Sequence, residues 1–416
     1  MTRQEQIDRL RRLAEQYMSI ARQPVMDERR ALWRGALSLR SRRVPVRLQF
    51  GMWNVWCREF FLPQLQCDEP TYRQLETHLL VETFHAATGD DDIFEPWYRV
   101  WPSRPQPGWG VEIWGVTSQR THTATVGGAW KNDPPLKDWN YRERLQPPTH
   151  AIDEADTQRR VALLRDAVGD ILPLAVDRQP VLLNFCGDIS THLAELRGLE
   201  QMMLDMYEAP EQLHGLLAFM RDAILRNQQQ AEDAGHFTLT LHENQMCHYT
   251  DELPDPRPNT PCRRQDLWGF MAAQEFALVS PAQHEEFLLR YQLPILRHYG
   301  LVHYGCCEDL TQKIDLLRQI PNLRSIAVSP MANLARCAEQ IGGDYFVSWR
   351  PSPAEMVATE WNPDRARRVL REGVATMQAN GCAGCILLKD IESVGGDTDR
   401  LRRFVELARE AVSTAA

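Results

Sequence analysis

The segment Gly300-Leu-Val-His-Tyr-Gly-Cys-Cys-Glu308 joins a short apolar run to two thiols and a carboxylate. Such a run is typical of a parallel strand that is buried on both faces, and its polar residues then fall where the strand ends in a loop. Successive strand residues point to opposite faces, so at most one of Cys306 and Cys307 faces inward unless the backbone has already turned. A thiol beside a carboxylate and an imidazole suits zinc, although free cysteines also serve as small buried hydrophobes.

Similar strands recur along the chain, and helical stretches separate them. The predicted strands lie at 44–50, 180–186, 237–243, 300–304, 325–330, 345–349 and 386–391. With one ill-defined strand before residue 95, the alternation gives eight βα units, the number of a TIM barrel. A doubly wound open sheet also alternates, but it usually carries a glycine-rich phosphate loop after its first strand, and Gly51-Met-Trp-Asn54 is not such a loop. The sequence therefore predicts an α/β fold, a (β/α)8 TIM barrel.

Two regions precede or interrupt the predicted barrel, which spans residues 44–416. Residues 1–43 carry apolar positions at helical spacing and predict an N-terminal helical extension. Residues 95–150 are rich in Pro, Trp and Thr. Their short alternating runs at 110–116 and 121–126 predict an inserted β-hairpin excursion, not a separate domain.

Composition limits the classes of function. The chain has 416 residues, 43% hydrophobic and 25% charged, as in soluble globular proteins. A formal net charge of -9 argues against nucleic-acid binding. The charged N-terminus lacks the apolar core of a signal peptide, and no apolar run approaches the roughly 18 residues of a membrane span. We therefore expect a cytoplasmic protein without nucleic-acid or membrane partners, whose 10 cysteines are reduced.

The carboxyl ends of the predicted strands gather polar side chains, and this is where TIM barrels place their active sites. The candidate catalytic residues there are Glu243, Glu308, Lys389 and Asp390. The candidate substrate-binding residues are Trp53, Asn54, His242, Trp349 and Arg350. Tryptophans at a barrel mouth would suit a flat, apolar or cationic ligand, unless they only fill the core. The Lys-Asp pair is costly to place after a buried strand, so it is either a structural ion pair or functional.

Three stretches resemble the uroporphyrinogen decarboxylase superfamily, which includes zinc-dependent methyltransferases of corrinoid and coenzyme M metabolism. Residues 196–211, Leu196-Arg-Gly-Leu-Glu to Glu-Ala-Pro-Glu211, resemble the family's helix pair with its Gly-hydrophobic-Glu, Asp and Pro-Glu positions. Residues 279–294 are similar to its Ser-Pro segment, and 303–309 occupy the place of its His-x-Cys-Gly-Asp strand end. The resemblance begins near Pro180 and covers about half of the chain. The fold it implies is also similar to that of cobalamin-independent methionine synthase.

The family's zinc pattern is altered in this chain. If Cys307 matches the family cysteine, the family histidine falls on Gly305; if His303 is kept, its spacing to Cys306 is one residue too long. The second family cysteine lies at the end of the last strand, where this chain has Lys389-Asp390. A zinc ion would therefore need a different set of ligands: Cys307, Glu308, Glu243 and Asp390.

The resemblance implies a methyltransferase that moves a methyl group from a small methoxylated or methylated donor to a corrinoid protein or a thiol. Zinc would bind the substrate heteroatom as a Lewis acid or lower the pKa of a thiol. The expected partners are the small-molecule substrate and a corrinoid protein, with a homodimer left open. Residues 51–58 do not match the arginine-rich motif that binds porphyrin carboxylates in the decarboxylase, so porphyrinogen decarboxylation is not expected.

Two other functions stay open. Lys389 and Arg350 could hold a carboxylate while Asp390 moves a proton, as in a metal-free decarboxylase or lyase. Alternatively, the altered ligand positions fit a barrel that has lost catalysis and binds a ligand or a partner protein.

Overall fold

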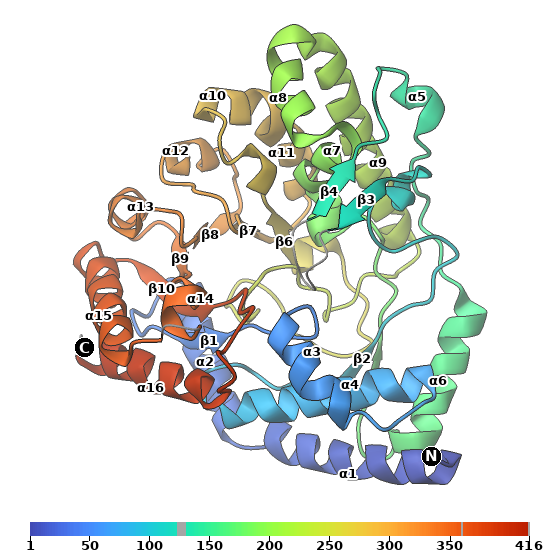
Figure 1. The fold of residues 1–416 in the computed structure, drawn as a ribbon, viewed down its shortest axis with the longest axis vertical. Coiled ribbons are helices and arrows are strands. Elements are labelled where there is room, and N and C mark those ends of the chain that lie inside the picture. Colours follow the sequence, from blue (N-terminus) through green and yellow to red (C-terminus); the bar gives the residue numbers. More distant parts are fainter. Residues whose placement is uncertain (123–129, 359–360, 415–416) are drawn as a thin grey trace.

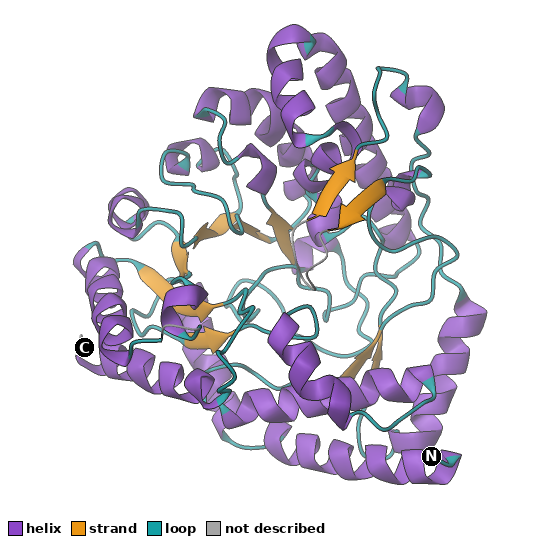
Figure 2. Cartoon of the chain, in the orientation of Figure 1, coloured by secondary structure: helices purple, strands orange, loops and turns teal. Residues whose placement is uncertain are grey.

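Six parallel strands form the main sheet of the computed structural model, which describes residues 1–122, 130–358 and 361–414. In spatial order they are β1 (Val46–Leu48), β10 (Ala383–Leu388), β9 (Phe346–Trp349), β8 (Leu323–Val328), β7 (Leu301–Tyr304) and β6 (Trp268–Met271). A second parallel pair, β2 (Tyr98–Val100) and β5 (Leu174–Val176), lies apart from this sheet. The α/β class is therefore confirmed, and Figure 2 shows both groups of strands among the helices.

The paired strands of the described residues do not close into a ring, so the predicted closed barrel is not confirmed. At the outer edge of β1, carboxylates take the place of a neighbouring strand. The Val46 N–H donates to Asp91 Oδ2 at 2.9 Å and the Leu48 N–H to Asp90 Oδ2 at 2.7 Å. The Asp91 N–H returns a bond to the Val46 carbonyl at 2.7 Å. The buried edge of β1 thus has its polar backbone groups satisfied without another strand.

Two predicted strands are wrong, and β2, β5 and β6 were not predicted. The 180–186 segment runs into a 3-10 turn at Asn184–Gly187, and the 237–243 segment forms only an isolated bridge between Thr238 and Pro261. The strand beside β7 is β6, Trp268–Met271. Near continuous apolarity does not distinguish a buried strand from an apolar loop that packs beside one. The predictions at 44–50, 300–304, 325–330 and 345–349 overlap β1, β7, β8 and β9, whereas β10 ends before Lys389.

Helices cover the outside of the strand arc (Figure 1). The first two, α1 (Arg3–Ala21) and α2 (Val25–Leu37), lie within residues 1–43, where helices were predicted. The others before β6 are α3 (Val55–Phe61), α4 (Pro70–Ala87), α5 (Tyr141–Arg144), α6 (Glu154–Val168), α7 (Ser190–Arg197), α8 (Leu199–Glu208) and α9 (Pro210–Asp233). Those after β6 are α10 (Pro281–His284), α11 (Arg290–Leu296), α12 (Ile314–Leu317), α13 (Leu334–Ile341), α14 (Pro353–Met356), α15 (Pro363–Ala379) and α16 (Asp399–Thr414).

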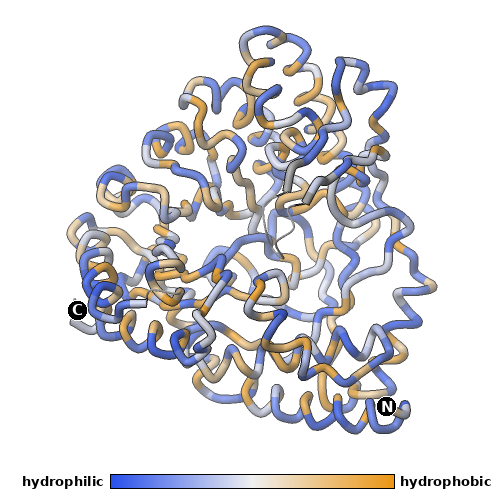
Figure 3. The backbone as a smooth tube through the Cα atoms, in the orientation of Figure 1, coloured by the Kyte–Doolittle hydropathy of each residue, from blue (hydrophilic) through white to orange (hydrophobic). Residues whose placement is uncertain are grey.

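The outer helices present one apolar face to the sheet. In α16, Leu401, Phe404, Val405 and Ala408 are buried at the i, i+3, i+4, i+7 spacing of such a face. In Figure 3 these helices alternate between hydrophilic and hydrophobic residues along the chain, as one buried face requires. No helix in the described ranges is long and apolar enough to cross a membrane.

The N-terminal extension also contributes to the core beneath the strands. Trp33 of α2 is fully buried in a cluster with Trp268, Leu301 and Phe346, residues from the starts of three strands. Its indole N–H donates to the Asp91 carbonyl at 2.7 Å, so it also anchors the carboxylate edge of β1. The helix therefore closes the amino ends of the strands.

The predicted excursion contains an antiparallel pair, β3 (Gln119–His122) and β4 (Trp130–Asp133). Residues 123–129 lie outside the described residues, so the predicted run at 121–126 is covered only in part. The predicted run at 110–116 is instead a 3-10 turn, Val111–Trp114, which begins and ends beside glycines at positive φ. Glycine adopts these angles at little cost, so the alternation there does not indicate a strand.

Candidate active site at the strand ends

The strand faces that point away from the covering helices are polar in the middle of the sheet. Val302, Tyr304 and Ile326 belong to the main core, so the alternating residues His303 and Ser325 point to the opposite face. These two are paired in the sheet and bonded, with His303 Nδ1 2.9 Å from Ser325 Oγ. The interior of a TIM barrel is normally packed with Val, Ile and Leu. Buried polar residues on this face therefore mark a site.

Cys306 lies at the centre of this polar face, immediately beyond the end of β7. Its side chain is only 2% exposed, and its Sγ accepts a hydrogen bond from Lys389 Nζ at 3.1 Å. Gln245 Nε2 lies 3.5 Å from the same sulfur. Gly305 adopts a φ of 99° and ends the pleat of the strand, after which Cys306 is buried and Cys307 exposed. The expectation that only one of the two thiols faces inward is thus confirmed.

The surroundings of Cys306 favour its thiolate form. The hydrogen bond from the Cys307 thiol, whose Sγ lies 3.4 Å away, is the largest contribution. Burial opposes ionisation, but the charges of Arg350 and Lys389 act against burial, and the pKa of Cys306 falls to about 5. The pKa of Cys307 is raised, because this thiol keeps its proton as the donor to Cys306. The proton shared by the two sulfurs therefore stays on the exposed one.

Arg350 holds the Cys306 turn through two hydrogen bonds. Its NH1 group donates to the Cys306 carbonyl at 2.6 Å, and NH2 lies 3.1 Å from His303 Nε2. Burial and the Arg350 charge hold the pKa of His303 well below its usual value, so the imidazole is neutral and accepts from Arg350. The guanidinium is 2% exposed and committed to these two partners. It fixes the turn that carries Cys306.

Two buried carboxyl groups and a half-buried one lie on the other side of the turn. Glu308 accepts from the Cys306 N–H at 2.8 Å and from the Ala273 N–H at 2.7 Å, and so ties the end of β7 to the end of β6. Half-buried Glu275 accepts from Ser190 Oγ at 2.8 Å. Burial raises the pKa of Glu308 and of Glu275, and burial together with Glu275 raises that of Asp188. Glu275 is therefore a candidate proton donor near a thiolate, a pairing of acid and nucleophile with pKa values shifted apart.

Several predicted site residues do converge here. Lys389 contacts Cys306, and its Nζ lies 3.3 Å from Asp390 Oδ2. The same carboxylate is 3.5 Å from Cys307 Sγ. Asp390 has a φ of 56°, a conformation that a residue with a side chain rarely adopts. Such local strain is typical of functional sites, where the surrounding structure maintains it.

Trp349, predicted as a substrate-binding residue, lies in the core instead. It belongs to the main core on the helix side of β9, and its ring packs so closely on Gly373 of α15 that a methyl group there would collide with it. Arg350, the next residue, points to the opposite face. Trp349 is therefore a packing residue, whereas Arg350 belongs to the site.

The remaining predicted residues have other places. Asn54 is fully buried, and its amide donates to Glu392 Oε1 at 2.9 Å at the start of α3. Trp53 is 58% exposed, with its ring over Gly51. His242 accepts from the N–H of Trp268, the first residue of β6, at 3.2 Å. It therefore lies beside the start of a strand and not at the end of one. Its neighbour Glu243 has a raised pKa through burial, and hydrogen bonds with Asn184.

The predicted zinc ligands are not gathered into one metal-binding group in the part of the chain that the structure describes. Within the described ranges, no group of three or more His, Cys, Asp and Glu side chains is arranged to hold a metal ion. The Glu308 carboxylate is already bonded to two backbone N–H groups, and the cations beside Cys306 would repel a metal ion. The residues present therefore do not fit the zinc ion that the resemblance implies, and no chemical step is assigned to it.

Cys306, Gln245 and Glu275 are among the residues of the site that the sequence did not single out as catalytic or binding. Gly305 gave a usable signal, because a glycine at a strand end permits a turn that changes which cysteine faces inward. Glu275 follows the apolar run 268–273, which is strand-like but was not assigned. Gln245 offered no signal, since its position depends on how the 237–261 segment packs against β6.

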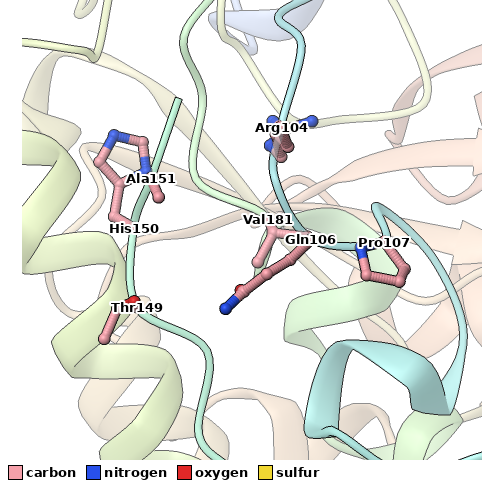
Figure 4. A pocket seen from close by; sticks show the side chains of 7 residues that line it. All are labelled: Arg104, Gln106, Pro107, Thr149, His150, Ala151 and Val181. Atoms are coloured by element: carbon pink, nitrogen blue, oxygen red, sulfur yellow. The ribbon is translucent and has the colours of Figure 1, made fainter. Parts of the chain in front are cut away.

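A small cavity elsewhere lies beside one of two half-buried imidazoles that contact each other. Arg104, Thr149, His150 and Val181 are among the residues around it in Figure 4. Its volume of about 10 Å³ is near the minimum for one water molecule. His150 Nε2 lies 2.7 Å from His236 Nδ1, and burial lowers the pKa of His150 to about 4. This neutral pair is best explained as a structural hydrogen bond.

Comparisons with known proteins identify no family for the chain. No protein-family model matches it, and no curated protein matches it either. Among solved structures, it is similar to a methyltransferase from Methanosarcina mazei, with a TM-score of 0.49 and 12% identity over 93% of this chain and 98% of that one. A likeness at this level establishes neither a family nor an activity, so a function has to rest on the site itself.

Proposed function

We propose that this protein is a group-transfer enzyme in which the Cys306 thiolate accepts a methyl group from a small methoxylated or methylated donor. The acceptor of the second transfer would be a small thiol or a corrinoid protein. The observation that carries the proposal is the buried Cys306 sulfur at 3.1 Å from the Lys389 ammonium, at the carboxyl ends of a parallel sheet. A thiolate held by a cation is the form of cysteine that acts as a nucleophile. The choice of methyl as the group comes from the sequence resemblance.

The chemistry balances without a metal. Cys306 Sγ attacks the methyl carbon, a carbon–sulfur bond forms, and the bond from carbon to the donor oxygen or nitrogen breaks. The electron pair moves to that heteroatom, which takes a proton from Glu275, the carboxyl whose pKa is raised. In the second half, the acceptor attacks the same carbon and Cys306 leaves as a thiolate. Lys389 and the Cys307 thiol then stabilise the returning negative charge.

The lyase alternative has less support. It requires Lys389 and Arg350 to hold a substrate carboxylate together, but the guanidinium ends of Arg350 are bonded to the Cys306 carbonyl and His303. The zinc site of Cys307, Glu308, Glu243 and Asp390 stays a prediction that metal analysis of protein purified without chelator tests. The proposed reaction does not depend on it.

Closure of the strands into a barrel is also part of this proposal. We infer a barrel-like ring in which the irregular segments 89–93 and 180–186 occupy strand positions between β1 and β6. The carboxylate edge of β1 supports this inference, because Asp90 and Asp91 bond to β1 as a neighbouring strand would. In such a ring the polar inner face would be the bottom of the active site.

Methylation of the purified protein with methyl iodide tests the function, since this probe needs no substrate recognition. Peptide mass spectrometry should find the methyl group on Cys306 before any other cysteine, and added dithiothreitol or cob(I)alamin should remove it. Chelator should change neither step. Cys262→Ser is the matched control, because it replaces a half-buried thiol outside the site. Methyl groups that settle on other cysteines first, or a methyl group on Cys306 that no acceptor removes, would contradict the proposal. Methoxylated aromatics and methylamines can then be screened as donors.

A further inference from the structure

The adjacent thiols Cys306 and Cys307 form a pair that methyl transfer does not explain. Their sulfurs lie 3.4 Å apart, one buried and the other exposed to solvent. Methyl transfer needs one thiolate, and a serine hydroxyl could donate the same hydrogen bond to it. A second thiol within contact of the first adds a capability that a hydroxyl lacks, the formation of a disulfide.

The two peptide groups of Cys306 are held by Arg350 and Glu308, but the pair itself is not part of a strand. Both cysteines follow the last residue of β7, Tyr304, and lie outside the strand ladder. A disulfide usually joins Cα atoms about 4.4–6.8 Å apart, whereas adjacent Cα atoms are about 3.8 Å apart. A disulfide between neighbours is therefore strained, and strained, exposed disulfides are the labile ones that thiols reduce easily. Such a bond suits a reversible modification and not a structural crosslink.

The neighbouring charges give the two sulfurs different roles. Of the two sulfurs, that of Cys306 is the one that Lys389 Nζ contacts, at 3.1 Å, which favours Cys306 as the sulfur that is oxidised first. Asp390 Oδ2 lies 3.5 Å from Cys307 Sγ and 3.3 Å from Lys389 Nζ. This exposed carboxylate can take the proton from Cys307 when the second sulfur reacts. The arrangement is that of an attacking thiol, a resolving thiol and a base.

We infer that Cys306 and Cys307 are a hydroperoxide-sensitive pair that closes reversibly into a disulfide between adjacent residues. The Cys306 thiolate attacks one peroxide oxygen, the oxygen–oxygen bond breaks, and an alcohol or water leaves with a solvent proton. Cys306 is then a sulfenic acid. Cys307 gives its proton to Asp390 and attacks the Cys306 sulfur, so that the sulfur–sulfur bond forms and the sulfur–oxygen bond breaks. The hydroxide that leaves takes the proton from Asp390 and departs as water. The two thiols supply the two electrons that reduce the peroxide, and a thiol reductant restores them.

This inference does not rest on methyl transfer, although it uses the same sulfur. Closure of the disulfide would remove the nucleophile from the site and protect it from irreversible oxidation to the sulfinic acid. A cell under oxidative stress would thus stop the enzyme without losing it.

Hydrogen peroxide and the full chain suffice for the test, with no methyl donor present. The wild-type protein should lose two hydrogens in its intact mass, with the change confined to the peptide that contains both cysteines, and dithiothreitol should reverse it. Cys307→Ser should instead give a Cys306 sulfenic acid that dimedone traps, and then irreversible higher oxides. Asp390→Asn should accumulate the sulfenic acid before the disulfide closes, while peroxide is consumed at the wild-type rate. Cys262→Ser should behave as wild type.

The wild-type experiment alone decides the matter if a variant fails to fold. Irreversible oxidation of wild-type Cys306, with no reducible species, would overturn the inference, as would a disulfide that pairs either sulfur with a different cysteine. Methyl transfer is measured separately, so either result can fail while the other stands.

Discussion

Replacement of Lys389 by glutamine should raise the pKa of Cys306. The Lys389 Nζ and Cys306 Sγ atoms are 3.1 Å apart. At an effective dielectric constant of about 20, two unit charges at this separation attract by about 5 kcal/mol, which corresponds to roughly 4 pKa units as a ceiling. The hydrogen bond from Cys307 and the charge of Arg350 remain in the variant. We therefore expect about half of the ceiling, a rise of roughly 2 units from about 5.

The pH dependence of alkylation measures this shift. The rate at which iodoacetamide labels Cys306, followed by peptide mass spectrometry, is proportional to its thiolate fraction. At pH 6, a rise of 2 units lowers that fraction about tenfold, and the rates of the two proteins should converge above about pH 8. The midpoint of the profile is the decisive quantity, because limited access to a buried sulfur scales every rate equally.

Two matched variants separate charge from packing. Lys389→Arg keeps the positive charge and should keep the wild-type midpoint within about 1 unit. Lys137→Gln makes the same change in a lysine that is paired with Asp133 on the surface, and it should leave the profile unchanged. Superimposable profiles for wild type and Lys389→Gln would refute the assignment of Lys389 as the counter-ion of a Cys306 thiolate.

Three further outcomes follow from other contacts. Burial alone would lower the pKa of His85, but Asp90 and Asp92 raise it to about 9. The charged His85 therefore stabilises the fold fully below about pH 6.5, and up to about 3 kcal/mol of this stability is lost as the pH rises through 9. Urea unfolding at pH 6 and pH 9 should show the loss, and His85→Gln should abolish it. Trp349→Ala should lower the unfolding free energy by about 3–5 kcal/mol, because it empties a core position. It should leave the midpoint of the Cys306 alkylation profile unchanged, and a shifted midpoint would show that Trp349 belongs to the site. Glu308→Gln should lower the unfolding free energy by about 1–3 kcal/mol, since one carboxylate oxygen that accepts a buried N–H is replaced by a donor. Melts followed by circular dichroism measure the loss, and a melt identical to wild type would show that Glu308 does not tie the ends of β6 and β7 together.

The alternation of strands and helices, with the α/β class, could be predicted because each parallel strand is a short apolar run between amphipathic helices. Which residues of a strand face the helices and which face the interior could not be predicted. In Phe346-Val-Ser-Trp349 every residue is buried, so the sequence carries no period-two signal to show that Trp349 faces the helices and Arg350 the interior. Only the register between neighbouring strands fixes that direction, and register is a long-range property.

The edge of β1 shows a second limit. Gly89-Asp-Asp-Asp92 is typical of an exposed turn, and nothing local indicates that Asp90 and Asp91 bond to a strand more than forty residues earlier in the chain. Side chains that substitute for a strand cannot be recognised from strand propensity. The predicted single ring of eight paired strands is therefore not confirmed in the described residues, where six strands form the main sheet and β2 and β5 pair apart from it. The positions of the later strands were close.

The electrostatics of Lys389 give an independent reason to expect a thiolate. Its ammonium group is 8% exposed, and a buried cation without a counter-charge is costly. The neighbouring carboxylate of Asp390 is 52% exposed, so water screens much of its attraction. Gln245 offers a carbonyl oxygen at 3.2 Å but no charge. The buried Cys306 sulfur is the partner that can neutralise Lys389 where water does not reach, and ionisation of this thiol lowers the free energy of both groups together. The same coupling means that any chemistry which caps Cys306, whether a methyl group or a disulfide, leaves Lys389 less compensated, and that cost favours return of the thiolate.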